Sequence, residues 1–207
     1  MKSLDDLIDG AKELTGLGLS KGEIADELNV SRETASWLVE QTDGGDAADS
    51  TTEKPHDIHV DWSAVGRDSQ RLSYVGRAMA DLLSKEGEAV DLTIGIGKSG
   101  GPLATTVARD LETDLSVYTP SKHRWDDDEQ EDVGSFSRNF ASIRDRDCYI
   151  VDDNIDTGKT MTETIQVVRE RGGNPVAGVV LTDKHGDDTV EGVPIYSLIQ
   201  IVQMTDA

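Results

Sequence analysis

The most informative stretch of the sequence is Cys148-Tyr-Ile-Val-Asp152-Asp153-Asn-Ile-Asp156-Thr157-Gly158-Lys159-Thr160. Four apolar residues typical of a buried strand lead into two paired carboxylates, and a Gly/Thr turn then opens a helix. Such a turn points backbone N–H groups and hydroxyls at one spot, at the positive end of the helix dipole, so it can hold a phosphate. The carboxylates of Asp152 and Asp153 precede the turn within reach of sugar hydroxyls, or of a metal that bridges to them. The stretch therefore predicts a strand, a phosphate-binding turn at Asp156–Thr160 and a helix.

Strands and helices alternate on both sides of this stretch. The apolar pattern predicts strands at 92–96, 115–118, 148–151, 176–181 and 195–201, and helices at 72–83, 102–111 and 161–171. Alternation of this kind indicates an α/β domain, with a parallel sheet covered by helices and with ligands bound at the carboxyl ends of the strands.

A second glycine-rich segment, Gly95-Ile-Gly-Lys98-Ser99-Gly100-Gly101, follows the first of these strands, and Pro102 is expected to begin the next helix. The segment fits the Gly-x-Gly-x-x-Gly pattern of dinucleotide-binding proteins. However, Gly95 lies within the strand and no acidic residue ends the following strand, so this interpretation ranks below a second phosphate-directed loop. Residues 158–160 also resemble the end of an NTPase P-loop, but that motif requires glycine at position 153, which is aspartate.

The domain organisation follows from a change of pattern near residue 50. Residues 46–57 lack apolar periodicity and are rich in polar residues, as expected of a linker. We expect a small all-helical domain at 1–45, the linker at 46–57 and the α/β domain at 58–207. The N-terminal part predicts one helix from Leu4 to Leu14 and two shorter helices that begin at the N-caps Ser20 and Ser31.

The two short helices resemble the helix-turn-helix of DNA-binding proteins, with Asn29 at the turn and residues 31–41 as the recognition helix. The start of such a helix reads base edges in the major groove. The candidate DNA-contacting residues are Ser31, Arg32, Glu33, Ser36 and Trp37, with Arg32 the best candidate for a guanine contact, and Ser20 and Lys21 for phosphate. Residues 1–45 carry four basic and ten acidic residues, a formal charge of −6. A helical dimerisation or interaction module is therefore the alternative.

The composition is strongly acidic. The chain has 207 residues, with 41 acidic and 20 basic residues and a formal charge of −21. This charge argues against binding polyanions through a broad basic surface, and against attraction to an anionic membrane. No apolar stretch is long enough for a membrane span, and the N-terminus is acidic where a signal peptide is basic and then apolar. We therefore expect a soluble cytoplasmic protein with no membrane partner.

Aspartate dominates the acidic residues, with 27 aspartates and 14 glutamates against only 9 lysines. Abundant hydrated carboxylates suit a protein kept soluble in concentrated salt, where a Debye length of about 3 Å at 1 M screens their mutual repulsion. A halophilic cytoplasm is expected, and an acidic mesophilic protein is the alternative. The single cysteine, Cys148, excludes an intrachain disulfide and a multi-cysteine metal site.

Residues 148–160 as a whole resemble the phosphoribosyl-diphosphate signature of type I phosphoribosyltransferases, and the resemblance extends over roughly 60–203. It implies that Asp152 and Asp153 hold ribose hydroxyls, that Asp156, Thr157, Gly158, Lys159 and Thr160 surround a 5′-phosphate, and that Lys98, Ser99 and Gly100 belong to the diphosphate-binding loop. Mg²⁺ would accompany a phosphoribosyl ligand. The sequence departs from the family at Asp156, where threonine is usual. This carboxylate would repel a phosphate by roughly 1 kcal/mol in water unless Lys159 offsets it.

Orotate phosphoribosyltransferases look similar in this region, but their mobile loop carries several lysines and a His-Gly pair. The corresponding loop here offers Lys122, His123 and Arg124, followed by six acidic residues within 126–132. Lys122 is kept as a candidate ligand-binding residue. The loop would neutralise a leaving diphosphate poorly, so no catalytic residue is assigned.

A helix-turn-helix joined to such a domain resembles the haloarchaeal GfcR-type transcriptional regulators of sugar catabolism. The resemblance implies a homodimer that binds double-stranded DNA and senses a phosphorylated metabolite. The hypothesis is that phosphate at Thr157–Thr160 shifts the recognition helices of the dimer. An active orotate or purine phosphoribosyltransferase is the main alternative, and a bifunctional protein is a third.

Overall fold

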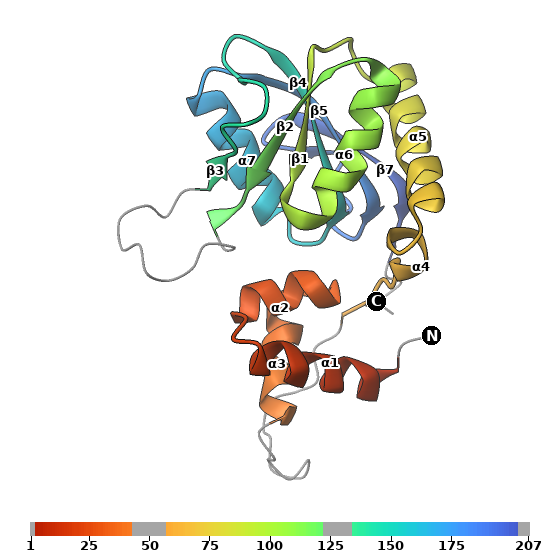
Figure 1. Cartoon of the computed structure of the whole chain (residues 1–207), viewed down its shortest axis with the longest axis vertical. Helices are drawn as coiled ribbons and strands as arrows, with labels where there is room; N and C mark the ends of the chain where they lie inside the picture. The colour runs from red at the N-terminus through yellow and green to blue at the C-terminus, as the bar shows by residue number, and fades with distance from the viewer. Residues whose placement is uncertain (1–2, 43–56, 122–133, 203–207) are drawn as a thin grey trace, which may run out of the picture. The chain divides into compact units, whose positions relative to one another are not determined.

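The structure is a computed structural model that describes residues 3–42, 57–121 and 134–202. The chain divides into two compact units, Met1–Ser63 and Ala64–Ala207 (Figure 1). The predicted linker at 46–57, apart from residue 57, and the predicted domain end at 45 lie outside the described residues. Those boundaries therefore stay predictions.

The N-terminal unit consists of helices α1 (Leu4–Gly16), α2 (Lys21–Leu28) and α3 (Arg32–Thr42). Ser20 caps α2 as predicted: its hydroxyl accepts a 3.3 Å hydrogen bond from the Glu23 N–H, and the Glu23 carboxylate accepts one of 2.9 Å from the Ser20 N–H. Asn29 ends α2 in the left-handed region, with φ of 53°, which asparagine tolerates better than most residues. The three helices enclose one apolar core made of Leu7, Ala11, Ile24, Ala25, Leu28, Val30, Ala35 and Leu38.

The C-terminal unit is built on one seven-stranded sheet with the order β3-β2-β1-β4-β5-β7-β6. Its strands are β1 (Leu92–Ile96), β2 (Asp114–Thr119), β3 (Ser135–Phe136), β4 (Asp147–Ile155), β5 (Asn174–Asp183), β6 (Thr189–Val190) and β7 (Val193–Gln200). The five inner strands run parallel, and the short edge strands β3 and β6 are antiparallel to their neighbours. The predicted α/β class with a mainly parallel sheet is confirmed.

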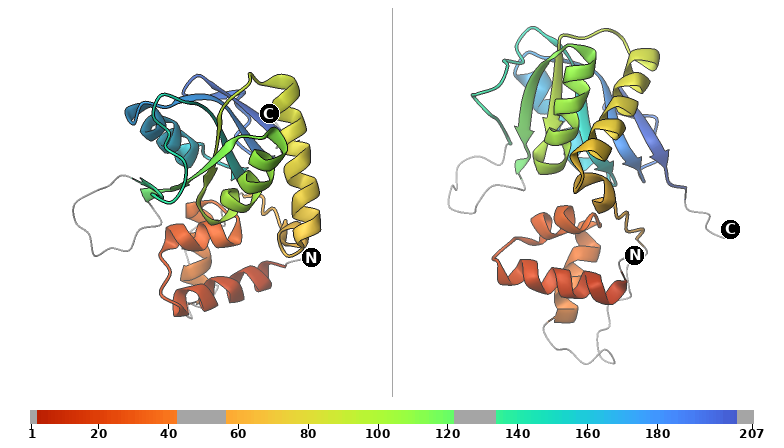
Figure 2. Two further views of the ribbon diagram at one scale, coloured as in Figure 1. Left: turned by 45° about the horizontal axis from the view of Figure 1, so that its top comes forward. Right: turned by 45° about the vertical axis from the view of Figure 1, so that its right-hand side comes forward.

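Helices cover both faces of the sheet (Figure 1, Figure 2). Helices α5 (Ser69–Glu86) and α6 (Gly97–Leu111) pack on one face, and α7 (Lys159–Glu170) packs on the other; α4 (Ser63–Gly66) precedes α5. Strand β4 serves both layers because its side chains alternate: Tyr149 and Val151 contact the α5–α6 layer, and Cys148 and Ile150 the α7 layer.

The start of α6 differs from its prediction. The helix begins at Gly97, with φ of 59° there, and Pro102 lies inside it rather than at its start. The glycines are needed for packing: a Cβ on Gly95 would lie 2.7 Å from the Cα of Gly101 and 2.8 Å from the Cβ of Ala104. Close packing of α6 onto β1 thus outweighs the weak helix propensity of glycine and the usual place of proline in the first turn.

Candidate functional site

The two predicted phosphate-directed segments lie side by side in the structure. Strands β1 and β4 are parallel neighbours, with Gly95 in register with Val151, so the segments that leave their carboxyl ends adjoin. Gly100 packs directly on β4, since a Cβ added there would lie 2.5 Å from the Val151 carbonyl oxygen and 3.1 Å from Oδ1 of Asp152. Glycine at position 100 thus allows the start of α6 to approach the carboxylate of Asp152.

The paired aspartates belong to β4 itself, which extends to Ile155 rather than ending at 151 as predicted. Asp153 is 7% exposed and Asp152 is half-buried. The Asp152 carboxylate accepts a 2.9 Å hydrogen bond from the backbone N–H of Asp153. Because consecutive residues of a strand point to opposite faces, the two carboxylates do not form a matched pair on one face.

The predicted turn at Asp156–Thr160 connects β4 to α7. Gly158 is the N-cap of α7, with φ of 74°, in the left-handed region that glycine favours. No side chain in the described part of the chain caps this helix. Thr157 and Lys159 are exposed, and Thr160 is half-buried. The N-terminal N–H groups of α7 therefore lie beside two exposed polar residues, in the arrangement that binds a phosphate elsewhere.

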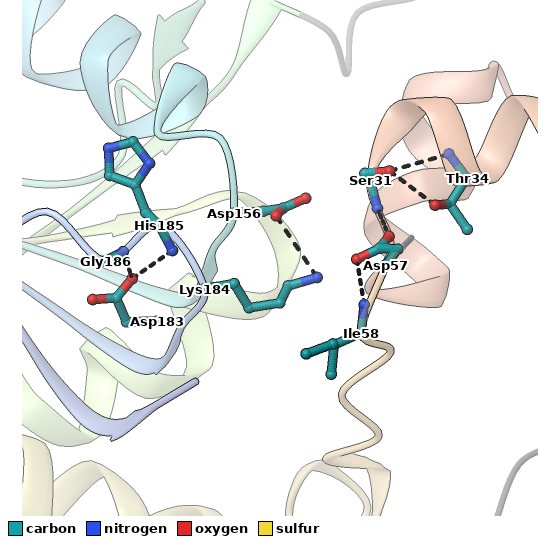
Figure 3. Close-up of polar contacts among 9 residues, drawn as sticks. All are labelled: Ser31, Thr34, Asp57, Ile58, Asp156, Asp183, Lys184, His185 and Gly186. Atoms are coloured by element: carbon teal, nitrogen blue, oxygen red, sulfur yellow. Dashed lines mark hydrogen bonds and ion pairs between the residues drawn. The ribbon is translucent and has the colours of Figure 1, made fainter. Parts of the chain in front are cut away.

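A cation that the sequence prediction missed faces this turn. The Nζ of Lys184 lies 3.9 Å from Oδ1 of Asp156 (Figure 3). The sequence prediction assigned Lys159 to offset the charge of Asp156, whereas the ion pair in the structure is made by Lys184. Lys184 follows β5, whose last residue, Asp183, is in register with Ile155 of β4. A lysine directly after the adjacent strand was the available signal.

His185 also reaches the turn. A Cβ on Gly158 would lie 3.2 Å from two atoms of the His185 ring, so the imidazole packs on the backbone of the N-cap. The buried carboxylate of Asp183 fixes this loop by accepting hydrogen bonds from the N–H groups of His185, at 2.7 Å, and Gly186, at 3.0 Å (Figure 3). The His185 ring in turn lies 3.2 Å from the Asp187 carboxylate.

The remaining predicted ligand-binding residues are placed less centrally. Lys98 is exposed and Ser99 half-buried, and both lie in the first turn of α6 rather than in a loop. Lys122 lies outside the described residues. Among the described residues, no three His, Cys, Asp or Glu side chains gather into a group that could hold a metal ion.

Glu163 of α7 ties that helix to the end of β2. Its carboxylate accepts hydrogen bonds from the Tyr118 hydroxyl, at 2.7 Å, and from the N–H and hydroxyl of Ser121, at 2.9 and 3.0 Å. Burial, followed by this hydrogen bond to Glu163, raises the pKa of Tyr118 well above its usual value. The phenol therefore remains a hydrogen-bond donor, and Ser121 is held against the helix that begins at the phosphate turn.

The predicted DNA-contacting residues lie along α2 and α3. Arg32 and Glu33 are exposed at the start of α3, and Ser31 and Ser36 are half-buried. Trp37 packs against the core of the N-terminal unit, so much of its ring is shielded. Lys21 is exposed, with its Nζ 3.9 Å from a Glu40 carboxylate oxygen.

A contact not foreseen from the sequence holds the start of α3. The backbone N–H of Ser31 donates a 2.6 Å hydrogen bond to Oδ2 of Asp57, whose Oδ1 accepts one of 2.7 Å from Ile58 (Figure 3). The Ser31 hydroxyl accepts a 3.1 Å hydrogen bond from the N–H of Thr34, as a helix N-cap does. The start of the candidate recognition helix is thus fastened to the segment that leads to the C-terminal unit.

This sheet, with a phosphate-type turn after β4, defines the phosphoribosyltransferase class of domain. A family model described as Phosphoribosyl transferase domain matches residues 61–205. The fold is also that of adenine phosphoribosyltransferase from Thermoanaerobacter pseudethanolicus, at 22% identity and a TM-score of 0.57 over 73% of this chain and 92% of that one. Orotate phosphoribosyltransferase from Aeropyrum pernix has 19% identity and a TM-score of 0.57, over 73% and 83% of the two chains.

Similarity to one group of regulators spans both units. The transcriptional regulator GfcR of Haloarcula marismortui is 66% identical over 206 residues, which cover 99% of this chain and 97% of that protein. The chain therefore belongs to the family of GfcR transcriptional regulators, within the phosphoribosyl transferase domain family. The resemblance inferred from residues 20–41 and 148–160 is thereby confirmed. Among the described helices, none has the length and apolar character that crossing a membrane requires.

Proposed function

We propose that the protein is a DNA-binding transcriptional regulator of sugar catabolism, and that its C-terminal domain senses a phosphorylated sugar. The observation that carries the proposal is the turn between β4 and α7, where an N-terminus without a side-chain cap adjoins Asp152 and the start of α6. A sugar phosphate suits this arrangement, with its phosphate on the helix N-terminus and its hydroxyls toward the carboxylate of Asp152.

The N-terminal unit supplies the DNA-binding part of the proposal. Its second and third helices are joined by a two-residue turn through Asn29 and Val30, and Arg32 is exposed at the start of α3. The acidity of the unit weakens phosphate contacts less than it would in dilute buffer, because concentrated salt removes most of the counterion-release gain for any protein. Two copies of the chain would place two recognition helices on a two-fold DNA site, so a homodimer is part of the proposal.

Mg²⁺ would enter this site together with a ligand that carries a diphosphate. Mg²⁺ is commonly held by one or two carboxylates and by the phosphates of a substrate. The half-buried carboxylate of Asp152 suits that role, and the ion would neutralise negative charge on the diphosphate. A permanently bound ion is not part of the proposal.

The proposal is tested with the full chain in concentrated KCl. DNA fragments that the protein selects from a random pool would define a binding sequence, and a band-shift titration would then measure affinity with and without ribose 5-phosphate or phosphoribosyl diphosphate. We expect a selected sequence, a changed affinity with a sugar phosphate, and loss of that change in Asp152→Asn. Absence of any selected sequence, or DNA affinity that no sugar phosphate alters, would contradict the corresponding half of the proposal.

A phosphoribosyltransferase is the second candidate function, because the turn and the carboxylate of Asp152 adjoin as a phosphoribosyl site requires. Incubation with phosphoribosyl diphosphate, Mg²⁺ and orotate or a purine base tests it through diphosphate release. The regulator proposal expects no turnover at enzymatic rates. Turnover that Asp152→Asn abolishes would establish the enzyme instead, and turnover together with sequence-selective DNA binding would establish a bifunctional protein.

A further inference from the structure

The carboxylate of Asp156 lies in the turn where the proposed ligand would place its phosphate. Asp156 is the residue between β4 and the exposed Thr157, two positions before the N-cap of α7. A carboxylate this close to a bound phosphate is repulsive in itself. The turn can accept a phosphate only if the charge of Asp156 is compensated or its side chain moves.

Lys184 is held in position to compensate that charge. Its backbone N–H donates a 2.9 Å hydrogen bond to the carbonyl of Ile155, which precedes Asp156. The next two residues are fixed by the buried carboxylate of Asp183. The lysine side chain is 6% exposed and that of Asp156 is 31% exposed, so the ammonium group lies on the protein side of the pair and the carboxylate on the solvent side.

The ion pair is a loose one. Its N–O separation of 3.9 Å exceeds the 2.8 Å of Lys85–Asp81 and of Arg146–Asp114 in the same unit. A charge-assisted hydrogen bond between ammonium and carboxylate needs about 2.7–2.9 Å. Attraction without a short hydrogen bond leaves Lys184 able to take a better acceptor at little cost.

We propose that Lys184 is an anion-binding residue of this site, and that Asp156 occupies it until a phosphate monoester arrives. The dianion on the N-terminus of α7 then takes the Lys184 ammonium, and the carboxylate of Asp156 turns toward solvent. This inference rests on the proposed function, because it assumes that a phosphate binds at the turn. It makes the site selective for dianions, since a ligand carboxylate offers Lys184 no more charge than Asp156 already does.

The exchange also gives the sensor a moving part. Asp156 belongs to the β4–α7 turn and Lys184 to the segment after β5, so breaking their pair changes how these neighbouring segments are held together. Ligands that differ only in phosphate or carboxylate would differ in this effect. Ribose 5-phosphate would break the pair, and ribonate, which has the sugar hydroxyls and a single negative charge, would leave it intact.

A double-mutant cycle on the full chain tests the exchange, with ribose 5-phosphate as the probe and calorimetry in concentrated KCl as the measurement. Asp156→Thr removes the competitor, so we expect binding tighter by about fivefold to tenfold, which corresponds to an ion pair of about 1 kcal/mol. Lys184→Gln should weaken binding by a similar factor. In the double variant the gain from Asp156→Thr should vanish, because there is no lysine left to release.

Lys159→Gln is the matched control, because Lys159 is an exposed lysine of the same turn. The gain from Asp156→Thr should persist in that background. Lys184→Arg, which keeps the charge, should bind more tightly than Lys184→Gln, and this separates loss of charge from loss of fold.

The outcomes distinguish the inference from the proposed function. Binding that Asp152→Asn reduces but Lys184→Gln leaves unchanged would overturn the exchange and keep the phosphate site. A gain from Asp156→Thr that survives in the Lys184→Gln background would overturn it as well. If the wild-type protein binds neither ribose 5-phosphate nor inorganic phosphate, both the site and the exchange are refuted.

Discussion

The backbone N–H of Ser31 is hydrogen-bonded at 2.6 Å to the carboxylate of Asp57, 26 residues further along the chain. The bond places a negative charge at the N-terminus of α3, where the helix dipole favours it. It also joins the start of the candidate recognition helix to the chain that continues into the C-terminal unit. A change in the path of that chain would therefore act directly on the end of the helix expected to read DNA.

Replacing Asp57 should destabilise the N-terminal unit. Asp57→Ala removes both the acceptor and the charge, so we expect a loss of about 1 kcal/mol, as for a lost helix N-cap. Asp57→Asn keeps an acceptor oxygen and should lose less. Scanning calorimetry of the full chain measures the effect on the transition of the helical unit. Asp9→Ala, at an exposed position of α1, is the control and should leave that transition almost unchanged; equal effects of Asp9→Ala and Asp57→Ala would show that the contact with Ser31 contributes nothing.

Two adjacent glycines of α6 should respond oppositely to alanine. A Cβ at Gly100 would lie 2.5 Å from the Val151 carbonyl oxygen, whereas a Cβ at Gly101 meets nothing within 4 Å. We expect Gly100→Ala to cost about 1–3 kcal/mol through overpacking and to displace Asp152. Gly101→Ala should be neutral or stabilise by up to about 1 kcal/mol through helix propensity.

Urea denaturation and ribose 5-phosphate binding measure the two consequences. Gly100→Ala should lose both stability and affinity, while Gly101→Ala should bind normally. If the two variants behave alike, Gly100 is not the point at which the two phosphate-directed segments meet.

Local patterns accounted for most of the fold. The N-caps Ser20 and Ser31, the left-handed Asn29 and the five inner strands were all predictable, because each depends on residues near in sequence. The edge strands β3 and β6 were not predicted, since two residues carry too little periodicity. Predicting the start of α6 failed for a different reason: close packing of Gly95 on Gly101 is a tertiary effect that overrides helix propensity.

The candidate site was predictable only in part. Residues 148–160 carry a local motif, and the parallel order of β1 and β4 brings Gly100 to Asp152. The ion pair of Asp156 with Lys184 depends instead on β5 lying next to β4, and the bond of Ser31 to Asp57 crosses the predicted linker. Contacts of this kind join segments that no local pattern relates.

The buried phenol of Tyr118 should make stability depend on alkaline pH. Its pKa is raised above the ordinary value of 10.0, mainly by burial and then by Glu163. A raised pKa means that the folded state holds the proton more tightly, so this contribution is complete below pH 10 and declines as the pH rises above it. The decline is at most about 1.4 kcal/mol per pH unit for one group.

Tyr118→Phe removes this titration and the hydrogen bond to Glu163. We expect the variant to be less stable than wild type near neutral pH by about 1 kcal/mol, and the difference to narrow above pH 10. Urea denaturation at a series of pH values measures this difference. A constant difference across the alkaline range would contradict the assignment of the titration to Tyr118.

Arg32 and Lys21 should contribute to DNA binding in different ways. Arg32 is exposed at the start of α3, where a side chain can reach base edges, whereas Lys21 lies at the start of α2 beside Glu40. We expect Arg32→Ala to lose about 1–3 kcal/mol of discrimination between the selected sequence and a variant altered at one guanine. Lys21→Ala should weaken both sequences about equally and should lower the salt dependence of binding.

The measurement is a competition titration with the two DNA duplexes at several KCl concentrations, and Lys12→Ala on α1 is the control for simple loss of positive charge. Discrimination that survives Arg32→Ala would remove Arg32 from the base-reading role. Equal effects of Lys12→Ala and Lys21→Ala would mean that the start of α2 holds no specific phosphate. Because Glu40 already pairs with Lys21, Glu40→Gln should strengthen binding to both duplexes if Lys21 contacts phosphate, and should leave their ratio unchanged.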